Sequence, residues 1–407
     1  MKERTSSLPA PGPGFVLGSG VALRTLLFLF TLTFWSRGLW TLSLFQAGVF
    51  GLAIVWAARM VLRPFCLRGS VLLVPLAGTA LWGLLQLASH RTVYRLATGN
   101  AVLDWTTCLV LFFLTLQVLA HPGTRRGFLD SLLWFGFAVS VLSVTQYFTS
   151  RGKIFWLFPT PYQDVLGPFV NQDHYSAFIE LVLPLGVLEA LRRRRNAVLY
   201  AGMAGVMFAS VIAGASRAGS LLVTLEIAGL LLLALLRGLV SGRKLALTLA
   251  KIALFVAAGT LVVGWEALWK RFQNPDPFKH RREMLSSSLA MARERPWTGS
   301  GLGTFETAYP AFALFDVGLV VDHAHNDWAE WAAEGGLPFF LMLFSVAVWS
   351  VPHAVRSPWG LGVVAVFLHS LVDYPMQKPV VAAWLFVLLG AMAARSKEDA
   401  APEGHAL

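Results

Sequence analysis

Two histidines stand close together in the longest polar stretch of the chain, in the order Asp322-His323-Ala324-His325-Asn326-Asp327. Asp327, followed by Glu330, favours a helix that begins with a capping box just after His325. The positive end of the helix dipole disfavours the imidazolium form of a histidine at such a position. A general base must be neutral, so the sequence makes His325 a candidate base. The alternative is a polar residue at the edge of a membrane.

The same stretch contains side chains that are able to bind a metal ion. They are Asp322, His323, His325 and Asp327. A His-Ala-His spacing places both rings on one side only in extended backbone, and no HExxH motif or second cluster accompanies it. We also find no Asp-x-Asp pair of the kind that carries Mg²⁺ to a sugar nucleotide. We therefore predict a site without a metal and without another cofactor.

Arginines form the second group of candidates. Arg217 lies in the turn Gly214-Ala215-Ser216-Arg217-Ala218-Gly219-Ser220, whose small residues let a ligand approach the guanidinium. Arg281 and Arg282 begin a segment with apolar residues at a helical period, which predicts a short surface helix as far as Glu294. A planar guanidinium pairs with two phosphate oxygens at once, so these arginines are suited to a diphosphate. For Arg217, contact with lipid headgroups is the alternative.

Further polar residues occur at the ends of apolar runs. Asn171, Asp173 and His174 enter one run together, and Asp373 follows His369 by one turn at the end of another, where an acid can orient a histidine.

A glycine-rich turn, Gly299-Ser300-Gly301-Leu302-Gly303, follows the predicted surface helix. Its backbone can approach a phosphate, although it lacks the lysine of a P-loop. A tight turn without a ligand is the alternative for Gly301 and Gly303.

The composition indicates what kind of frame must position these residues. Of the 407 residues, 56% are hydrophobic and 14% are charged, and the mean hydropathy is +0.63. A soluble domain has about 25% charged residues, so a soluble, disordered or fibrous chain is excluded. The two cysteines provide no disulfide framework. We predict an all-α polytopic membrane protein.

Twelve apolar runs are long enough to cross a bilayer as helices. They cover residues 18–36, 40–58, 69–88, 101–120, 127–149, 168–191, 197–214, 218–236, 246–265, 336–352, 357–373 and 379–394. Basic residues gather in alternate connections, for example Arg59, Arg63 and the run Arg192–Arg195, which places both termini in the cytoplasm. The net charge of +11 is therefore a topology signal and does not indicate nucleic-acid binding.

The predicted layout has five parts. They are a cytoplasmic tail at 1–17, nine transmembrane helices in 18–265, a large outer loop at 266–335, three transmembrane helices in 336–394 and a cytoplasmic tail at 395–407. The N-terminus lacks the apolar core of a signal peptide, and Gly335-Gly336 is expected to end the helix before the tenth span. Arg217, Arg281 and His325 all fall on the outer side. A base with an arginine cluster suits transfer from a lipid-linked diphosphate.

An ordered set of segments across about residues 165–395 resembles the O-antigen ligase and polymerase superfamily of bacterial inner-membrane proteins. The segments are Phe169-Val170-Asn171-Gln172-Asp173-His174-Tyr175-Ser176-Ala177, Ala215-Ser216-Arg217-Ala218-Gly219, Pro296-Trp297-Thr298-Gly299-Ser300-Gly301-Leu302-Gly303-Thr304-Phe305, and His325-Asn326 with Gly336 after them. The resemblance implies a GT-C-like, metal-independent glycosyltransferase. Such an enzyme takes a glycan from undecaprenyl diphosphate on the periplasmic face of the inner membrane.

The resemblance also implies roles for individual residues. His325 is expected to activate an acceptor hydroxyl, and Asp373 to support the site. Arg217, with Arg281 or Arg282, is expected to hold the donor diphosphate. Supporting residues are expected at Asn171, His174, Ser216, Asn326, Gly301 and Gly303.

The acceptor stays open at this stage. It is the lipid A core in a ligase, a lipid-linked repeat unit in a polymerase, or a serine or threonine in a protein-directed relative. The spacing from His325-Asn326 to Gly336 favours a ligase, and the short polar tail argues against the protein-directed type. The alternative from another class is a transporter or a lipid-linked glycan flippase, although a transporter typically places its polar groups near the bilayer midplane.

Overall fold

The structure is a computed structural model that describes residues 9–36, 40–162, 164–193, 195–238, 240–274, 279–315, 318 and 320–395. Within these residues the chain is almost entirely helical. Its strands are the antiparallel pair β1 (Lys153–Ile154) and β2 (Phe158–Pro159). The predicted tails are residues 1–17 and 395–407, and of these, residues 1–8 and 396–407 lie outside the described residues.

The nine apolar runs before the long loop all contain a helix. The helices are α1 (Pro13–Thr33), α2 (Trp40–Leu62), α3 (Leu73–Ala88), α4 (Arg95–Val118), α5 (Pro122–Thr149), α6 (Gln172–Arg192), α7 (Ala197–Ala213), α8 (Arg217–Leu236) and α9 (Gly242–Val263). Their bounds differ from the predicted runs by several residues. The largest difference is at α4, which begins at Arg95 instead of near 101, because hydropathy does not mark the polar first turns of a helix.

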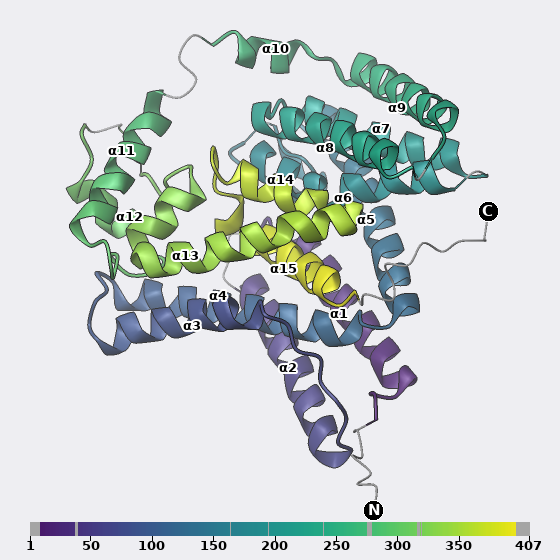
Figure 1. Ribbon diagram of the computed structural model, residues 1–407. Coiled ribbons are helices and arrows are strands. Elements are labelled where there is room, and N and C mark those ends of the chain that lie inside the picture. Colours follow the sequence, from purple (N-terminus) through teal and green to yellow (C-terminus); the bar gives the residue numbers. More distant parts are fainter. Residues whose placement is uncertain are drawn as a thin grey trace, which may run out of the picture.

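The rest of the chain contains the predicted loop helices and the last apolar helices. In order they are α10 (Glu266–Phe272), α11 (Lys279–Glu294), α12 (Phe305–Ala308), η1 (Tyr309–Ala311), α13 (Asp327–Arg356), η2 (Pro358–Gly360), α14 (Leu361–His369), η3 (Pro375–Gln377) and α15 (Pro379–Ala393). Helix α11 covers the predicted surface helix. In Figure 1, α11 and α12 lie at one end of the molecule, beside the start of α13.

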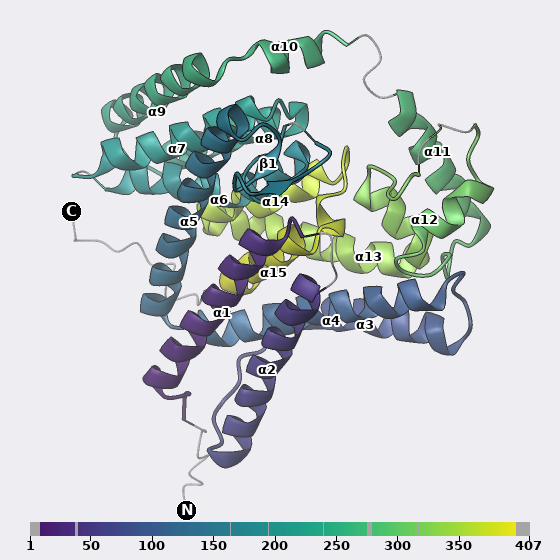
Figure 2. The same ribbon diagram turned by 180° about the vertical axis from the view of Figure 1, so that it is seen from behind.

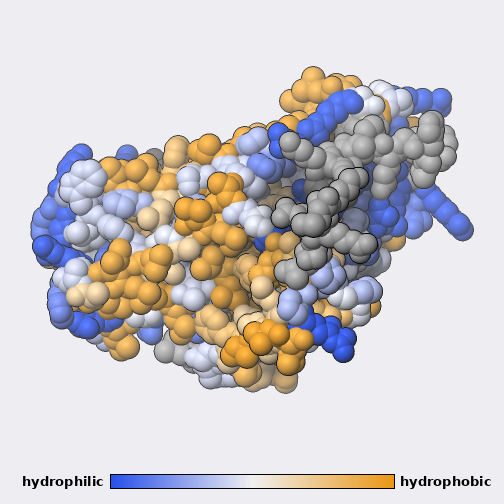
Figure 3. Space-filling model, turned by 60° about the horizontal axis from the view of Figure 1, so that its bottom comes forward, coloured by the Kyte–Doolittle hydropathy of each residue, from blue (hydrophilic) through white to orange (hydrophobic). Residues whose placement is uncertain are grey.

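Eight helices in the described part of the chain are long and apolar enough to cross a membrane, namely α1, α2, α4, α5, α6, α8, α9 and α13. Four further segments, α3, α7, η2 with α14, and α15, are apolar but shorter. On the face shown in Figure 3, apolar residues cover the middle, and hydrophilic residues gather towards the two ends. The chain is therefore an all-helical membrane protein, and its count of twelve spans remains a prediction.

Helices α6 and α15 form the core. In α6, 94% of the most apolar window is buried, and α15 is buried from Val380 to Met392. Helix α6 packs against α7, α8 and α14, while α15 packs against α4. By contrast, α9 is mostly exposed and runs along the edge of the molecule in both ribbon views (Figures 1 and 2).

The start of α13 differs from the predicted capping box by one residue. The cap is Asn326, whose side-chain oxygen accepts a hydrogen bond from the Ala329 amide. Glu330 instead accepts from the Ala324 amide, so it holds the preceding loop. Gly336 does not end the helix. It forms a kink, with φ at 67°, and helix continues on both sides of it.

A loop from 370 to 374 follows α14, and Asp373 lies in it. The predicted span at 357–373 is therefore too long, because α14 ends at His369. Pro375 keeps the helix from continuing through Tyr374, since a residue before proline is disfavoured in helical backbone, and Tyr374 has ψ at 53°. Asp327 binds the loop by accepting from the Ser370 hydroxyl and the Met376 amide. The start of α13 is thereby fixed against the loop.

Candidate active site

His325 and Asp373 form a hydrogen-bonded pair at this junction. His325 Nδ1 lies 2.7 Å from Asp373 Oδ1. The Asp373 side chain is 1% exposed and the His325 side chain is 25% exposed. A carboxylate accepts the Nδ1 proton, so Nε2 is the acceptor nitrogen of the neutral ring. This is the geometry of a general base oriented by a carboxylate.

The backbone of His325 is strained in this arrangement. Its φ is 49°, in the left-handed region that residues with a side chain rarely adopt. The turn is maintained from both sides, because Glu330 binds the Ala324 amide and Asn326 Nδ2 donates to the Leu371 carbonyl at 2.8 Å. Backbone strain of this kind is typical of functional sites.

The charge of Asp373 is stabilised by its neighbours. Burial alone would raise its pKa, but the hydrogen bond from His325 and the nearby His174, His369 and Arg281 side chains hold the pKa well below its ordinary value. The carboxylate is therefore charged at physiological pH.

Arg281, from α11, connects Asp373 to a second carboxylate. Its guanidinium lies 3.7 Å from Asp373 Oδ1 and 3.6 Å from Asp173 Oδ2, and it donates to the Val372 carbonyl at 2.6 Å. Its neighbour Arg282 is exposed. Of the two predicted arginines, Arg281 is thus the one directed at the His325–Asp373 pair.

The first turns of α6 and α8 meet at Asp173. Asn171 caps α6 by accepting from the Asp173 amide at 2.7 Å, and the Ser216 hydroxyl donates to Asp173 Oδ1 at 2.6 Å. Ser216 also caps α8 by accepting from the Gly219 amide. The predicted residues Asn171 and Ser216 therefore act through Asp173 and fix where α6 and α8 begin.

A second guanidinium group lies near this junction. Arg217, the first residue of α8, donates to the Arg271 carbonyl at 3.3 Å, and Arg271 donates to the side-chain oxygen of Gln172 at 2.7 Å. Arg217 is within electrostatic range of Arg281 and Asp173. Positive groups beside helix N-termini favour binding of an anion such as a diphosphate.

Three histidine rings surround the buried ring of Tyr374. The ring centroids lie 4.9 Å away for His174, 4.5 Å for His323 and 4.7 Å for His325. His174 therefore lies beside Tyr374 together with His325, and its buried Nε2 has no hydrogen-bond partner among the described residues.

His323, which also contacts the Tyr374 ring, makes a second histidine–carboxylate pair. Its Nδ1 lies 2.9 Å from Glu330 Oε1. Burial, followed by the positive charge of Lys378, lowers the pKa of His323 to about 4. His323 is thus neutral at pH 7 and is a second candidate base, which the sequence indicated only as a possible metal ligand.

The glycine-rich turn is bound by the protein itself. Gly303 N donates to Glu334 Oε2 at 2.8 Å, and Gly301 N donates to the Glu334 carbonyl. A Cβ atom on Gly301, where φ is 112°, would lie 2.3 Å from Thr92 Oγ1. None of the contacts described for Gly301 and Gly303 joins them to His325, and the turn is bound to Glu334 of α13.

The ligand set considered for a metal is not brought together by the structure. His323 binds Glu330, His325 binds Asp373 and Asp327 binds Ser370. A different set, Asp173, His369 and Asp373, has polar atoms within 4.8 Å of one another. The guanidinium of Arg281 lies between the two carboxylates of this set, so an arginine supplies the cation there.

The sequence analysis missed several residues of the site. Arg271 gave no signal, and Glu330 was expected only in a capping box, because only the folded chain shows its contacts with His323 and the Ala324 amide. Glu180 did give one, since it is an acid within an apolar run, and such residues are often functional. Its partner His369 was noted only for its spacing to Asp373.

Comparison with curated proteins gave no match. A family model described as O-antigen ligase matches residues 177–344. The matched stretch contains Arg217, Arg281 and His325, whereas Asn171, His174 and Asp373 lie outside it. Over residues 177–344, the chain is therefore similar to the O-antigen ligase family.

Proposed function

We propose that this protein transfers a glycan from an undecaprenyl-diphosphate donor to the lipid A core, on the periplasmic face of the bacterial inner membrane. The matched family supports lipid-linked glycan transfer of the ligase or polymerase type. The observation that carries the proposal is the convergence of His325, Asp373 and Arg281 from three separate segments. A base beside a phosphate-binding cation is what this reaction requires.

In the proposed reaction, His325 Nε2 accepts the proton of an acceptor hydroxyl. The oxygen of that hydroxyl bonds to the anomeric carbon of the donor. The bond from that carbon to the diphosphate oxygen breaks on the opposite face, so the configuration inverts. Asp373 stabilises the imidazolium that forms. Arg217 and Arg281 offset the negative charge of the departing undecaprenyl diphosphate, the role a metal ion has in other transferases.

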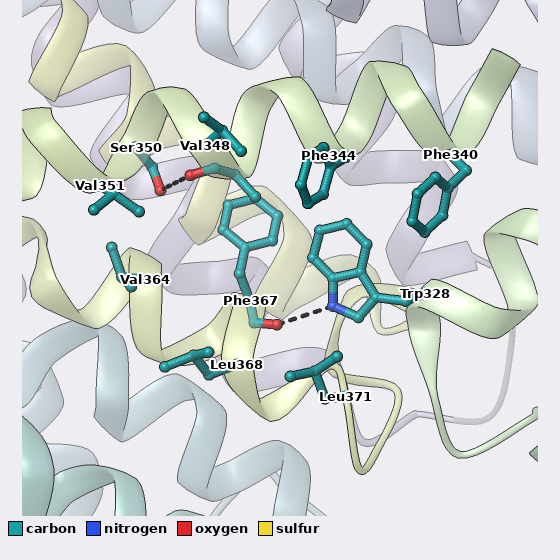
Figure 4. A pocket seen from close by; sticks show the side chains of 11 residues that line it. Trp328, Phe340, Phe344, Val348, Ser350, Val351, Val364, Phe367, Leu368 and Leu371 are labelled. Carbon is teal, nitrogen blue, oxygen red and sulfur yellow. Dashed lines mark hydrogen bonds between the residues drawn. The ribbon is translucent and has the colours of Figure 1, made fainter. Parts of the chain in front are cut away.

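Two adjacent apolar cavities beside α13 suit the lipid chain of the donor. Their volumes are about 360 Å³ and 520 Å³, and both are lined by Trp328 and Phe340. The larger one reaches Asn326, next to His325, and the smaller one follows α13 and α14 as far as Val351. Figure 4 shows the Trp328 indole held by a hydrogen bond to the Phe367 carbonyl.

A transfer assay with purified protein tests the proposal. It uses a lipid-diphosphate glycan donor, with lipid A core or a second lipid-linked unit as acceptor and chelator present throughout. Transfer to the core identifies a ligase, and ladders built on the lipid-linked unit identify a polymerase. If the protein transfers nothing but moves the donor across a bilayer, it is a transporter and the proposal fails.

His325→Ala and His323→Ala form a matched pair of variants for the base. General-base catalysis contributes about 10²–10⁴-fold, so we expect kcat to fall by that factor in His325→Ala. His323→Ala should keep most of the activity. The opposite order would assign the base to the His323–Glu330 pair, and full activity in both variants would exclude a histidine base.

A further inference from the structure

A buried histidine–carboxylate pair lies next to the candidate site. His369, the last residue of α14, places its Nδ1 2.7 Å from Glu180 Oε1 of α6. Both side chains are 0% exposed. An ionisable pair within apolar helices is costly to bury, and in membrane proteins such residues usually serve a function. The proposed reaction uses neither residue.

Unpartnered atoms connect this pair to Asp373. His369 Nε2 and Asp373 Oδ2 are buried, and neither has a hydrogen-bond partner among the described residues. The two side chains have polar atoms within 4.8 Å of each other. Because Nδ1 donates its proton to Glu180, a lone pair on Nε2 would add to the negative potential of two carboxylates. A proton on Nε2 balances that potential, so His369 is an imidazolium between Glu180 and Asp373.

We propose that His369, held as a cation by Glu180 and Asp373, is a positioning residue that sets the basicity of His325 through the Asp373 carboxylate. The inference depends on the proposed role of His325 as the base. The four groups lie in the order Glu180, His369, Asp373 and His325. The His369 cation lies between the two carboxylates, and Asp373 is hydrogen-bonded to His325. The His369 cation reduces the negative potential that Asp373 places on the His325 ring, and this favours the neutral form that a base requires.

Other charged and titratable groups share this environment. They are Asp173 and His174 of α6, Glu226 of α8, Arg281 of α11, Asp327 and Glu330 of α13, and Lys378 before α15. Arg281 already lies between Asp173 and Asp373. A His369 variant retains all of these groups and removes one charge from the cluster.

The experiment compares the pH dependence of glycan transfer by the wild type and by His369→Gln. Glutamine keeps a polar side chain of similar reach but carries no charge. We expect the acid limb of the pH–rate profile to move to higher pH by about one unit, because Asp373 then favours the protonated form of His325 more strongly. The matched control is His353→Gln, whose histidine bonds the Trp349 carbonyl within α13. Its acid limb should coincide with that of the wild type.

A second variant, Glu180→Gln, provides the same test in case His369→Gln does not fold. In Glu180→Gln the amide oxygen still accepts the Nδ1 proton, but the imidazolium loses one of its two carboxylates. The acid limb should again move upward. A lower rate with an unmoved limb, in whichever of the two variants folds, overturns the inference and leaves only a packing role. His369→Lys, which keeps a cation, should return the limb to the wild-type position, and a limb as high as that of His369→Gln contradicts the proposal.

Failure of the proposed function gives a different result. In that case the wild type transfers no glycan, or His325→Ala keeps full activity. If the wild type is active, His325→Ala is inactive and the limb of the His369 variants does not move, the inference about His369 fails by itself.

Discussion

A single carboxylate oxygen, Asp373 Oδ1, has two partners in the site. It accepts from His325 and lies 3.7 Å from the guanidinium of Arg281. The base and the proposed phosphate ligand are therefore coupled through one residue. A change at Arg281 affects the environment of His325 even though no contact between their side chains is described.

Arg281→Lys tests whether the fork of the guanidinium is required. An ammonium is a compact charge that cannot reach Asp173, Asp373 and the Val372 carbonyl together. We expect kcat to fall by about 10–100-fold, because the charge of the leaving group develops in the transition state. Steady-state kinetics with the lipid-linked donor measures this. Arg282→Lys is the matched neighbour, and an equal loss there would show that Arg282 also contacts the phosphates.

The low pKa of Asp373 predicts how stability depends on pH. Its folded-state pKa lies below the ordinary value of about 3.9, so its stabilising contribution is complete above that value. The contribution is lost only as the pH falls through the folded-state pKa. The difference in thermal stability between the wild type and Asp373→Asn should therefore not shrink as the pH falls from 8 to 5. A difference that shrinks between pH 7 and pH 5 would contradict the low pKa.

At the scale of elements, the kink in α13 joins the candidate site to the apolar half of the helix. Gly336 has a φ of 67° and packs against the end of the α11 segment, where the Leu337 amide donates to the Pro296 carbonyl at 2.7 Å. The first part of α13 carries the cap beside His325, and the second part lines the apolar cavity. The kink therefore sets the angle between the polar and the apolar parts of the site.

Gly336→Ala should destabilise the protein by about 1–3 kcal/mol. A Cβ atom there would lie 2.8 Å from the Pro296 carbonyl oxygen, in addition to the backbone strain. The matched control is Gly51→Ala in α2, where a Cβ atom meets nothing within 4 Å and alanine is the better helix former. Thermal unfolding in detergent compares the two. Equal stability of both variants would mean that the kink relaxes without cost.

Much of the frame was predictable from the sequence, and the site only in part. Apolar runs identified the helical segments, because burial in lipid requires long apolar stretches. The helix at 281–294 followed from its period. The end of α14 was missed because hydropathy continues past His369 and does not show where the backbone leaves the helix. The contacts Glu180–His369 and Arg281–Asp173 join segments far apart in the chain, so no local pattern reveals them.

At the scale of the whole molecule, native Cys66 and a cysteine introduced at Thr307 test the predicted orientation. Native Cys66 is exposed and lies in a connection that we expect in the cytoplasm, while Cys108 is buried. Thr307, near the end of α12, is exposed on the loop that we expect in the periplasm. In intact cells, a membrane-impermeant thiol reagent should label Thr307→Cys and leave Cys66 unlabelled. Labelling of Cys66 alone would reverse the orientation.

The position of Arg281 between two carboxylates has a consequence for turnover. The two carboxylates already neutralise the guanidinium, so a diphosphate must compete with acidic side chains for it. The same acids compete for the guanidinium once the glycan has left. We therefore expect Asp173 to limit product inhibition. Asp173→Asn should bind undecaprenyl diphosphate more tightly and accumulate enzyme with product bound, so the balance of opposing charges would tune how readily the spent carrier leaves.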